Sequence, residues 1–236
     1  MKKQNFAGLF VGLCVCMASM VAEAQNIMPM GDSVTARGDN PESSYRYWLW
    51  KDLEAIGFSG QFVGNQFGVS DGAPLNSDFD QHYEGGGAAD DAWGTQDGID
   101  NIGDANSHSP DIVLLDLGSN DYDGSLSPRD TLAQVRANLD TIIQGLAAQN
   151  PGIVVLLAKP TPWVTPDKLE RRFMSGLGAA VAKAAADERR AGVRVILVDL
   201  HSGFNPRKDT KDGTHPNVRG EQKIANKYFH ALRRVL

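Results

Sequence analysis

Short runs of consecutive apolar residues alternate with longer amphipathic stretches along most of the chain. Runs that are apolar throughout predict strands buried on both faces. They fall at residues 27–30, 111–117, 153–158 and 193–200, with a shorter one at 61–64. Apolar residues at helical spacing predict helices over about 44–56, 128–149, 167–190 and 218–234. Buried strands separated by helices indicate a parallel sheet covered on both sides, so we expect a three-layer α/β/α sandwich.

One long stretch, residues 66–110, interrupts this alternation and is rich in Gly, Asp, Asn and Ser. We expect a surface loop with one or two short helices, for instance near 93–102. A loop of this length in a compact domain is usually functional. The sequence contains no internal repeat and no boundary of a second domain, so residues 25–236 are predicted to form a single domain.

Residues 1–24 have the pattern of a secretory signal peptide. Lys2 and Lys3 form a positive segment, residues 7–22 carry no charge, and Ala22-Glu23-Ala24 supplies small residues two apart. A membrane anchor is the alternative, but a span needs roughly 20 apolar residues, more than this run provides. We therefore expect a secreted or periplasmic protein without stable membrane insertion after cleavage.

Charge and cysteine content exclude several classes of function. The formal charge is −6, which argues against nucleic acid or an anionic membrane as the main partner. Both cysteines, Cys14 and Cys16, lie within the predicted signal peptide. A chain cleaved after Ala24 would contain no disulfide, no thiol nucleophile and no cysteine-based metal site.

Polar residues with catalytic potential follow the predicted strands. In open α/β sheets, ligands bind beyond the carboxyl ends of the strands. The residues found there are Gly31-Asp32-Ser33, Gly118-Ser119-Asn120-Asp121, the segment 159–163, and the loop that holds Asp212 and His215. The same edge of the sheet is thus expected to present a Ser, an Asn, an Asp and a His.

These residue types suit nucleophilic catalysis by serine. A serine hydroxyl needs a neighbouring base, and the base needs a group that fixes its tautomer. Three residues apart on a turn, Asp212 can reach Nδ1 of His215 while Nε2 faces outward to Ser33. The developing oxyanion needs hydrogen-bond donors. The candidates are the Asn120 amide, the Ser33 backbone N–H and the Gly-rich segment 85–87, and the reaction requires no cofactor.

The motifs resemble those of SGNH (GDSL-type) serine hydrolases. Residues 28–35, with Gly31-Asp32-Ser33, are similar to the first block of that family, residues 118–121 to the third, and residues 212–215 to the fifth. Residues 45–64 and 82–85 resemble the branch known as carbohydrate esterase family three. The resemblance implies a flavodoxin-like fold, Ser33 as nucleophile, His215 as base and Asp212 as its orienter. It also implies Asn120 and a second-block glycine as oxyanion donors.

The second block departs from the usual pattern of this branch, because Ala88 stands where the last glycine is expected. We predict Gly87 as the backbone donor, with Ala88 and Gly86 as alternatives. The resemblance implies acetyl groups on xylan or a related glycan as substrate. A short-chain esterase, a lysophospholipase and a non-catalytic carbohydrate-binding relative are the alternatives. The Gly-x-Ser-x-Gly elbow of α/β-hydrolases is absent.

Further residues of the predicted loops are candidates for substrate contact or support. Trp163 is a candidate sugar platform, with loop packing as the equal alternative, and Trp93, Tyr83 and Tyr122 lie in similar loops. Asp32 is a second candidate for substrate contact, although Asp32 and Asp121 are expected to brace the loops rather than react. No metal site is predicted, because the acidic loop lacks the spacing of a calcium loop. Surface or structural roles are expected for His82, His108, His201 and His230.

Overall fold

The centre of the fold is a five-stranded parallel sheet in the order β2-β1-β5-β6-β7. The computed structural model describes residues 25–38, 44–72, 76–87 and 90–236. The strands are β1 (Asn26–Gly31), β2 (Gln61–Phe62), β5 (Ile112–Asp116), β6 (Val154–Lys159) and β7 (Arg194–Asp199). The predicted parallel sheet is confirmed, and its strand order is that of flavodoxin-like doubly wound folds.

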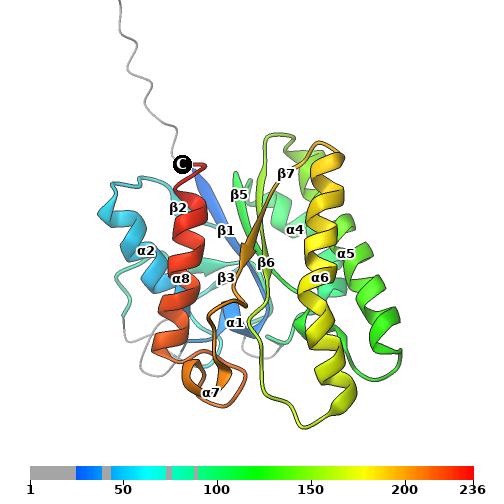
Figure 1. Ribbon diagram of the computed structural model, residues 1–236. Coiled ribbons are helices and arrows are strands. Elements are labelled where there is room, and N and C mark those ends of the chain that lie inside the picture. The colour runs from blue at the N-terminus through cyan, green and yellow to red at the C-terminus, as the bar shows by residue number, and fades with distance from the viewer. Residues whose placement is uncertain (1–24, 39–43, 73–75, 88–89) are drawn as a thin grey trace, which may run out of the picture.

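Helices cover both faces of this sheet, as Figure 1 shows, and the three-layer prediction is confirmed. On one face lie α2 (Ser44–Ala55) and α8 (Val218–Leu232). The other face carries α3 (Thr95–Asp100), α4 (Ile102–Ser107), α5 (Pro128–Gln149) and α6 (Lys168–Arg190). Each face therefore has its own buried apolar cluster.

The central strands supply both clusters by alternation. In β1, Met28 packs with the cluster under α5 and α6, whereas Ile27 packs with the cluster under α2 and α8. In β5, Val113 likewise packs with the cluster under α5 and α6, and Leu114 packs with the cluster under α2 and α8. Because successive side chains of a strand point to opposite faces, a strand covered on both sides must be apolar at every position. This explains the uninterrupted apolar runs in the sequence.

Several short elements lie within the predicted loops. They are α1 (Ser33–Ala36), the 3₁₀ helix η1 (Ser119–Asp121), α7 (Pro206–Asp209), and the antiparallel pair β3 (Gln66–Phe67) and β4 (His82–Tyr83). The residue after β4 continues onto the sheet, since Glu84 N donates to Pro29 O at 2.8 Å and Gly31 N donates to Glu84 O at 3.1 Å. The long loop is thereby attached to β1. Two-residue strands are too short to show a periodicity in the sequence.

Helix α2 differs in two ways from its predicted pattern. It ends at Ala55, and Ile56, an apolar residue at the end of the predicted helix, is 49% exposed. Conversely, Arg46 is fully buried. Its guanidinium donates to the carbonyl oxygens of Thr35 at 3.0 Å, Gln81 at 2.6 Å and Gly68 at 2.6 Å. Arg46 thus connects the long loop to the segment that follows β1.

Two sequence predictions fall outside the described residues. The predicted signal peptide, with Cys14 and Cys16, occupies residues 1–24, and Ala88 lies in the gap at 88–89. Within the part of the chain that the structure describes, no helix is both long and apolar enough to cross a membrane.

Candidate active site

The predicted site lies where the winding of the sheet reverses. The chain leaves β1 towards α2 on one face and leaves the adjacent strand β5 towards α5 on the other. Such a reversal opens a crevice at the carboxyl ends of the two strands, where ligands of doubly wound folds bind. Ser33 follows β1 and η1 follows β5, so both reach this crevice.

Ser33 is held at the start of a short helix. Its neighbour Asp32 is the N-cap of α1, and Asp32 Oδ1 accepts a hydrogen bond from Val34 N at 2.9 Å. The backbone N–H of a first helical residue has no acceptor within its own helix, so the Ser33 N–H is available to a ligand. The side chain is 9% exposed, which leaves its hydroxyl accessible from one side.

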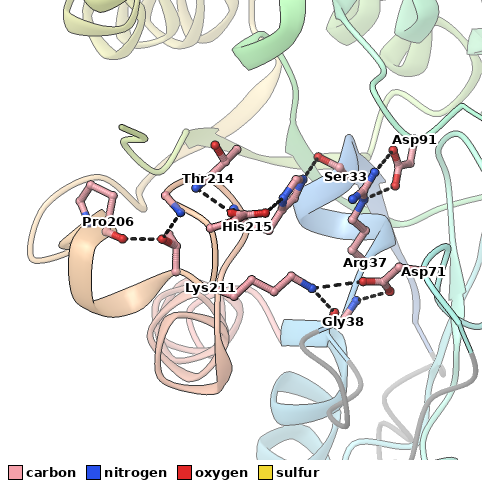
Figure 2. Close-up of polar contacts among 12 residues, drawn as sticks. Ser33, Arg37, Gly38, Asp71, Asp91, Pro206, Lys211, Thr214 and His215 are labelled. Atoms are coloured by element: carbon pink, nitrogen blue, oxygen red, sulfur yellow. Dashed lines mark hydrogen bonds and ion pairs between the residues drawn. The ribbon is translucent and has the colours of Figure 1, made fainter. Parts of the chain in front are cut away.

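His215 lies between Ser33 and Asp212 in a chain of hydrogen bonds (Figure 2). Its Nε2 is 3.1 Å from Ser33 Oγ, and its Nδ1 is 2.7 Å from Asp212 Oδ2. The structure therefore brings together the three residues that the sequence proposes as nucleophile, base and orienter. With Nδ1–H donating to the carboxylate, Nε2 carries the lone pair that can accept the serine proton.

Asp212 is fixed as a carboxylate by its own loop. Partial burial alone would raise the pKa of Asp212, but hydrogen bonds outweigh it and lower the pKa to about 2. They come from the His215 ring and from the backbone N–H groups of Thr214 and His215, which donate to Asp212 Oδ1 at 2.9 and 2.7 Å. The negative charge opposite Nδ1 is thus present throughout the neutral pH range.

The loop that carries Asp212 and His215 is closed on itself. Lys211 N donates to His215 O at 2.9 Å, and Gly213 has a φ of +97°, which suits a residue without a Cβ. Gly213 O accepts a hydrogen bond from Val164 N at 2.9 Å, which ties this loop to the one after β6. Helix α8 begins three residues after His215 and anchors the end of the loop.

Asn120 faces the same pocket from η1. Its Nδ2 donates to Trp93 O at 3.2 Å, which orients the amide and leaves its second hydrogen for another acceptor. Ser33, Asn120, Trp163 and His215 all line a pocket of about 340 Å³. The pocket thus combines a nucleophile, a base and an amide donor.

The third oxyanion donor is not placed by this geometry. Among the described residues, the pocket wall includes neither Gly87 nor Gly86, and Ala88 lies outside the description. Gly87 O accepts from Asp90 N at 3.0 Å, and the next two residues, Asp91 and Ala92, line the pocket. The donor role of Gly87 stays a prediction.

Asp32 does not line the pocket, so its predicted contact with substrate gains no support from this geometry and stays a prediction. Its side chain is buried beneath α1, where it caps the helix, and it does not line the pocket. Burial raises the pKa of Asp32 well above its ordinary value, and the nearby Asp116 adds to this rise. Asp121 braces a loop as expected, since it accepts hydrogen bonds from Thr95 N at 3.0 Å and from Thr95 Oγ1.

A pair of charged residues beside the nucleophile was missed by sequence reasoning. Arg37 Nη2 donates to Asp91 Oδ1 at 2.9 Å, and Arg37 Nε donates to Asp91 Oδ2 (Figure 2). Both residues line the pocket, and Ser70 Oγ also donates to Asp91, at 2.8 Å. The two partners are 54 positions apart and each lies in a loop, so no local periodicity relates them.

The candidate aromatic residues separate into two groups. Trp163 lines the pocket, as expected for a substrate contact. Tyr122 instead stacks on Phe173, with ring centroids 5.5 Å apart. Trp93 and Tyr83 are buried, and the Arg46 guanidinium covers the Tyr83 ring at 4.3 Å. Trp93 and Tyr83 therefore pack within the protein, whereas Tyr122 is half-buried and lies outside the wall of this pocket.

Comparison with known proteins agrees with this geometry. Residues 30–223 match the model of the GDSL-like lipase/acylhydrolase family. A multidomain esterase of Ruminococcus flavefaciens is 27% identical over 91% of this chain, but the chain spans only 29% of that protein's length.

Two solved structures of carbohydrate esterases share the fold. A family 3 carbohydrate esterase of Clostridium thermocellum has a TM-score of 0.70 and 26% identity, with 89% of this chain and 98% of that chain covered. A family 3 carbohydrate esterase from Talaromyces cellulolyticus has a TM-score of 0.72 and 24% identity, over 89% and 97% of the two chains. The predicted resemblance to the SGNH (GDSL-type) hydrolases is confirmed.

Proposed function

The chain belongs to the GDSL-like lipase/acylhydrolase family, and from this premise we propose that it is a serine esterase that removes O-acetyl groups from a carbohydrate. The observation that carries the proposal is the position of the His215 ring. Its Nε2 lies 3.1 Å from Ser33 Oγ while its Nδ1 lies 2.7 Å from Asp212. This is the arrangement that activates a serine hydroxyl for acyl transfer.

In the proposed first step, Ser33 Oγ attacks the ester carbonyl and His215 Nε2 accepts the hydroxyl proton. The C–O π bond opens, and its electrons move onto the oxygen. Two donors suit that oxyanion, the Ser33 backbone N–H and the second hydrogen of the Asn120 amide. Protonated His215 then gives its proton to the departing alcohol, which leaves an acetyl group on Ser33.

In the second step, His215 accepts a proton from water, and the hydroxide attacks the acetyl carbonyl. The tetrahedral intermediate collapses, the bond from the acetyl carbon to Ser33 Oγ breaks, and Ser33 Oγ regains its proton from His215. The acetyl group leaves as acetic acid, which loses its proton to the solvent to give acetate. Asp212 keeps the imidazole in one orientation through both steps, because its carboxylate holds Nδ1–H.

The polar character of the pocket supports a carbohydrate as the alcohol portion. Arg37, Asp91, Asn120 and Glu170 surround the nucleophile, and Trp163 is the aromatic side chain among them. Sugar hydroxyl groups can bond to such side chains, whereas a long acyl chain would require a continuous apolar groove. The solved relatives that are named as carbohydrate esterases support the same choice. A lysophospholipase or general short-chain esterase is the second candidate.

The nucleophile is tested with Ser33→Ala in the purified protein, with p-nitrophenyl acetate as substrate. We expect turnover to fall by about 10⁴-fold or more, because removal of a triad member leaves only oxyanion and binding effects. Ser175→Ala is the control, since Ser175 is exposed on α6 and bonds only to its own helix. Residual activity above about one tenth of wild type in Ser33→Ala would contradict the proposal.

The substrate class is tested by parallel assays on acetylated xylan, a lysophospholipid and p-nitrophenyl acetate. If kcat/KM is highest for acetate release from the glycan, the result supports a carbohydrate as the substrate class. If kcat/KM is higher for the lysophospholipid, the enzyme is instead a lysophospholipase. We expect Trp163→Ala to lower kcat/KM on the glycan by roughly tenfold and to spare the aryl ester, because stacking serves only the sugar.

A further inference from the structure

A second cluster of side chains with metal-ligating atoms lies on the α4 side of the sheet. It consists of Glu84, Asp104 and His108, and one ligand atom from each lies within 4.8 Å of the others. Asp104 belongs to α4, and His108 is the residue that ends this helix. Four residues apart on a helix, the two side chains emerge on the same face, here towards Glu84.

Glu84, one member of this cluster, has a carboxylate oxygen without a partner among the described residues. Its side chain is fully buried, and Oε2 accepts a hydrogen bond from Asn65 N at 3.1 Å. Oε1 is buried and has no hydrogen-bond partner among the described residues. A buried carboxylate oxygen without a partner is costly, and native proteins usually satisfy such an atom with a donor, a water or an ion.

The charges in the cluster are also unbalanced. The buried Glu84 carboxylate and the Asp104 carboxylate lie side by side, with ligand atoms within 4.8 Å of each other. Among the ion pairs of the described residues, none joins Lys or Arg to Glu84 or Asp104. A cation held between the two carboxylates would offset both the repulsion and the missing hydrogen bond.

We propose that Glu84, Asp104 and His108 form a binding site for a divalent transition-metal ion, with Zn²⁺ as the best match. One imidazole nitrogen and two carboxylate oxygens are ligands that Zn²⁺ accepts, and water can complete its tetrahedron. Ca²⁺ instead takes six to eight oxygen ligands, so a histidine argues against it.

The cluster must contract slightly around the ion. Zn²⁺ bonds of roughly 2.0–2.2 Å place neighbouring ligand atoms about 3.3 Å apart, which is closer than the limit of 4.8 Å that encloses them here. Asp104 is exposed and His108 is half-buried, so both side chains can rotate towards Glu84. Glu84 is held by the sheet and sets the position of the ion.

The site connects two parts of the chain that support the nucleophile. Glu84 is bonded through its backbone to Pro29 and Gly31 of β1, and Gly31 precedes Ser33 by two residues. A metal ion bound by Glu84 and by residues of α4 would therefore tie this helix to β1, the strand that precedes Ser33. Because the ion binds the folded state, it is expected to stabilise the protein. This role is independent of ester hydrolysis.

The test uses the full chain without a histidine tag, treated with a chelator, and measures Zn²⁺ binding by titration calorimetry. We expect one Zn²⁺ per chain and at least about tenfold weaker binding in Asp104→Asn and in His108→Ala. Both residues lie at the surface, so the variants should fold. His82→Ala is the matched control, because His82 is also half-exposed beside a carboxylate, with Nδ1 2.7 Å from Asp80 Oδ1.

Thermal unfolding gives a second readout that does not depend on activity. Zn²⁺ should raise the Tm of the wild type and of His82→Ala, and this rise should disappear in His108→Ala and in the isosteric Glu84→Gln. Absence of binding at roughly 100 µM Zn²⁺ would overturn the proposal. So would equal affinity in wild type and His108→Ala, or tighter binding of Ca²⁺ than of Zn²⁺.

Discussion

The Nε2 atom of His215 lies 3.1 Å from the Oγ atom of Ser33, although 182 positions separate the two residues in the sequence. Ser33 follows the first strand of the sheet, and His215 lies in the loop before the last helix. They meet because α8, which follows His215, packs on the same face as α2, which follows Ser33. The two ends of the described fold thus jointly form one catalytic unit.

Asp212→Asn should lower kcat by about 10³- to 10⁴-fold with little change in fold. An amide in place of the carboxylate can no longer hold the productive tautomer of His215 or stabilise its positive charge. Steady-state kinetics on p-nitrophenyl acetate measure the effect, and circular dichroism checks the structure. Activity within tenfold of wild type would remove Asp212 from the proposed mechanism.

The same carboxylate predicts a pH dependence of stability. Its folded-state pKa of about 2 lies below the ordinary value of 3.8, so its stabilising effect is fully present above about pH 4. It is lost as the pH falls through about 2, where the folded form becomes protonated. We expect the Tm difference between wild type and Asp212→Asn to stay constant from pH 7 to 4 and to shrink below that. A difference that shrinks already between pH 7 and 5 would show that another group is responsible.

Asn120→Asp tests the oxyanion donor, because the two side chains have the same shape but the carboxylate has no N–H. We expect kcat to fall by about 10²- to 10³-fold, with KM changed much less, since the donor acts on charge that develops in the transition state. A rise in KM at unchanged kcat would instead assign Asn120 to substrate binding. Asn120→Ala separates the loss of the donor from the added negative charge.

Gly31→Ala should destabilise the fold and disturb the nucleophile. A Cβ atom at Gly31 would stand 2.8 Å from Asp116 O of β5 and would also clash with Thr35 of α1, so β1 would have to move away from both elements. Overpacking of this kind costs about 1–3 kcal/mol. Urea unfolding measures the loss, and Gly103→Ala is the control, because its Cβ would meet open space. Equal stability of the two variants would show that the strand accommodates the methyl group.

Arg46→Met should lower the free energy of unfolding by about 3 kcal/mol or more. The substitution removes a buried guanidinium that donates to the carbonyl oxygens of Thr35, Gln81 and Gly68. Thr35 O and Gln81 O keep weaker contacts from Ser44 Oγ and Gly68 N, both at 3.3 Å, whereas Gly68 O loses this donor. Arg172→Met, at an exposed position of α6, is the control and should change the free energy of unfolding by less than about 0.5 kcal/mol. Chemical denaturation of both variants decides the matter, and a loss below about 1 kcal/mol at Arg46 would contradict its structural role.

Much of the fold and the central residues of the site follow from local sequence. Strands buried on both faces read as uninterrupted apolar runs, and parallel strands bring their carboxyl ends to one edge of the sheet. Ser33 and Asn120 each follow such a run directly, and Asp212 and His215 share one turn. Their convergence could therefore be predicted without knowing any distance between them.

Other features depend on contacts between segments that have no common pattern. Arg37 and Asp91 come from separate loops, and Glu84 joins Asp104 and His108 only because the residue after β4 lies beside β1 under α4. Asp32, which follows the same strand as Ser33, turns inward to cap α1 instead of facing the pocket. Local sequence determined the sheet, its helices and the residues at their ends, since periodicity and turn chemistry act over a few positions. The tertiary structure alone decided which loops meet. Packing brings together side chains from separate loops, and their separation in the sequence does not determine whether they are in contact.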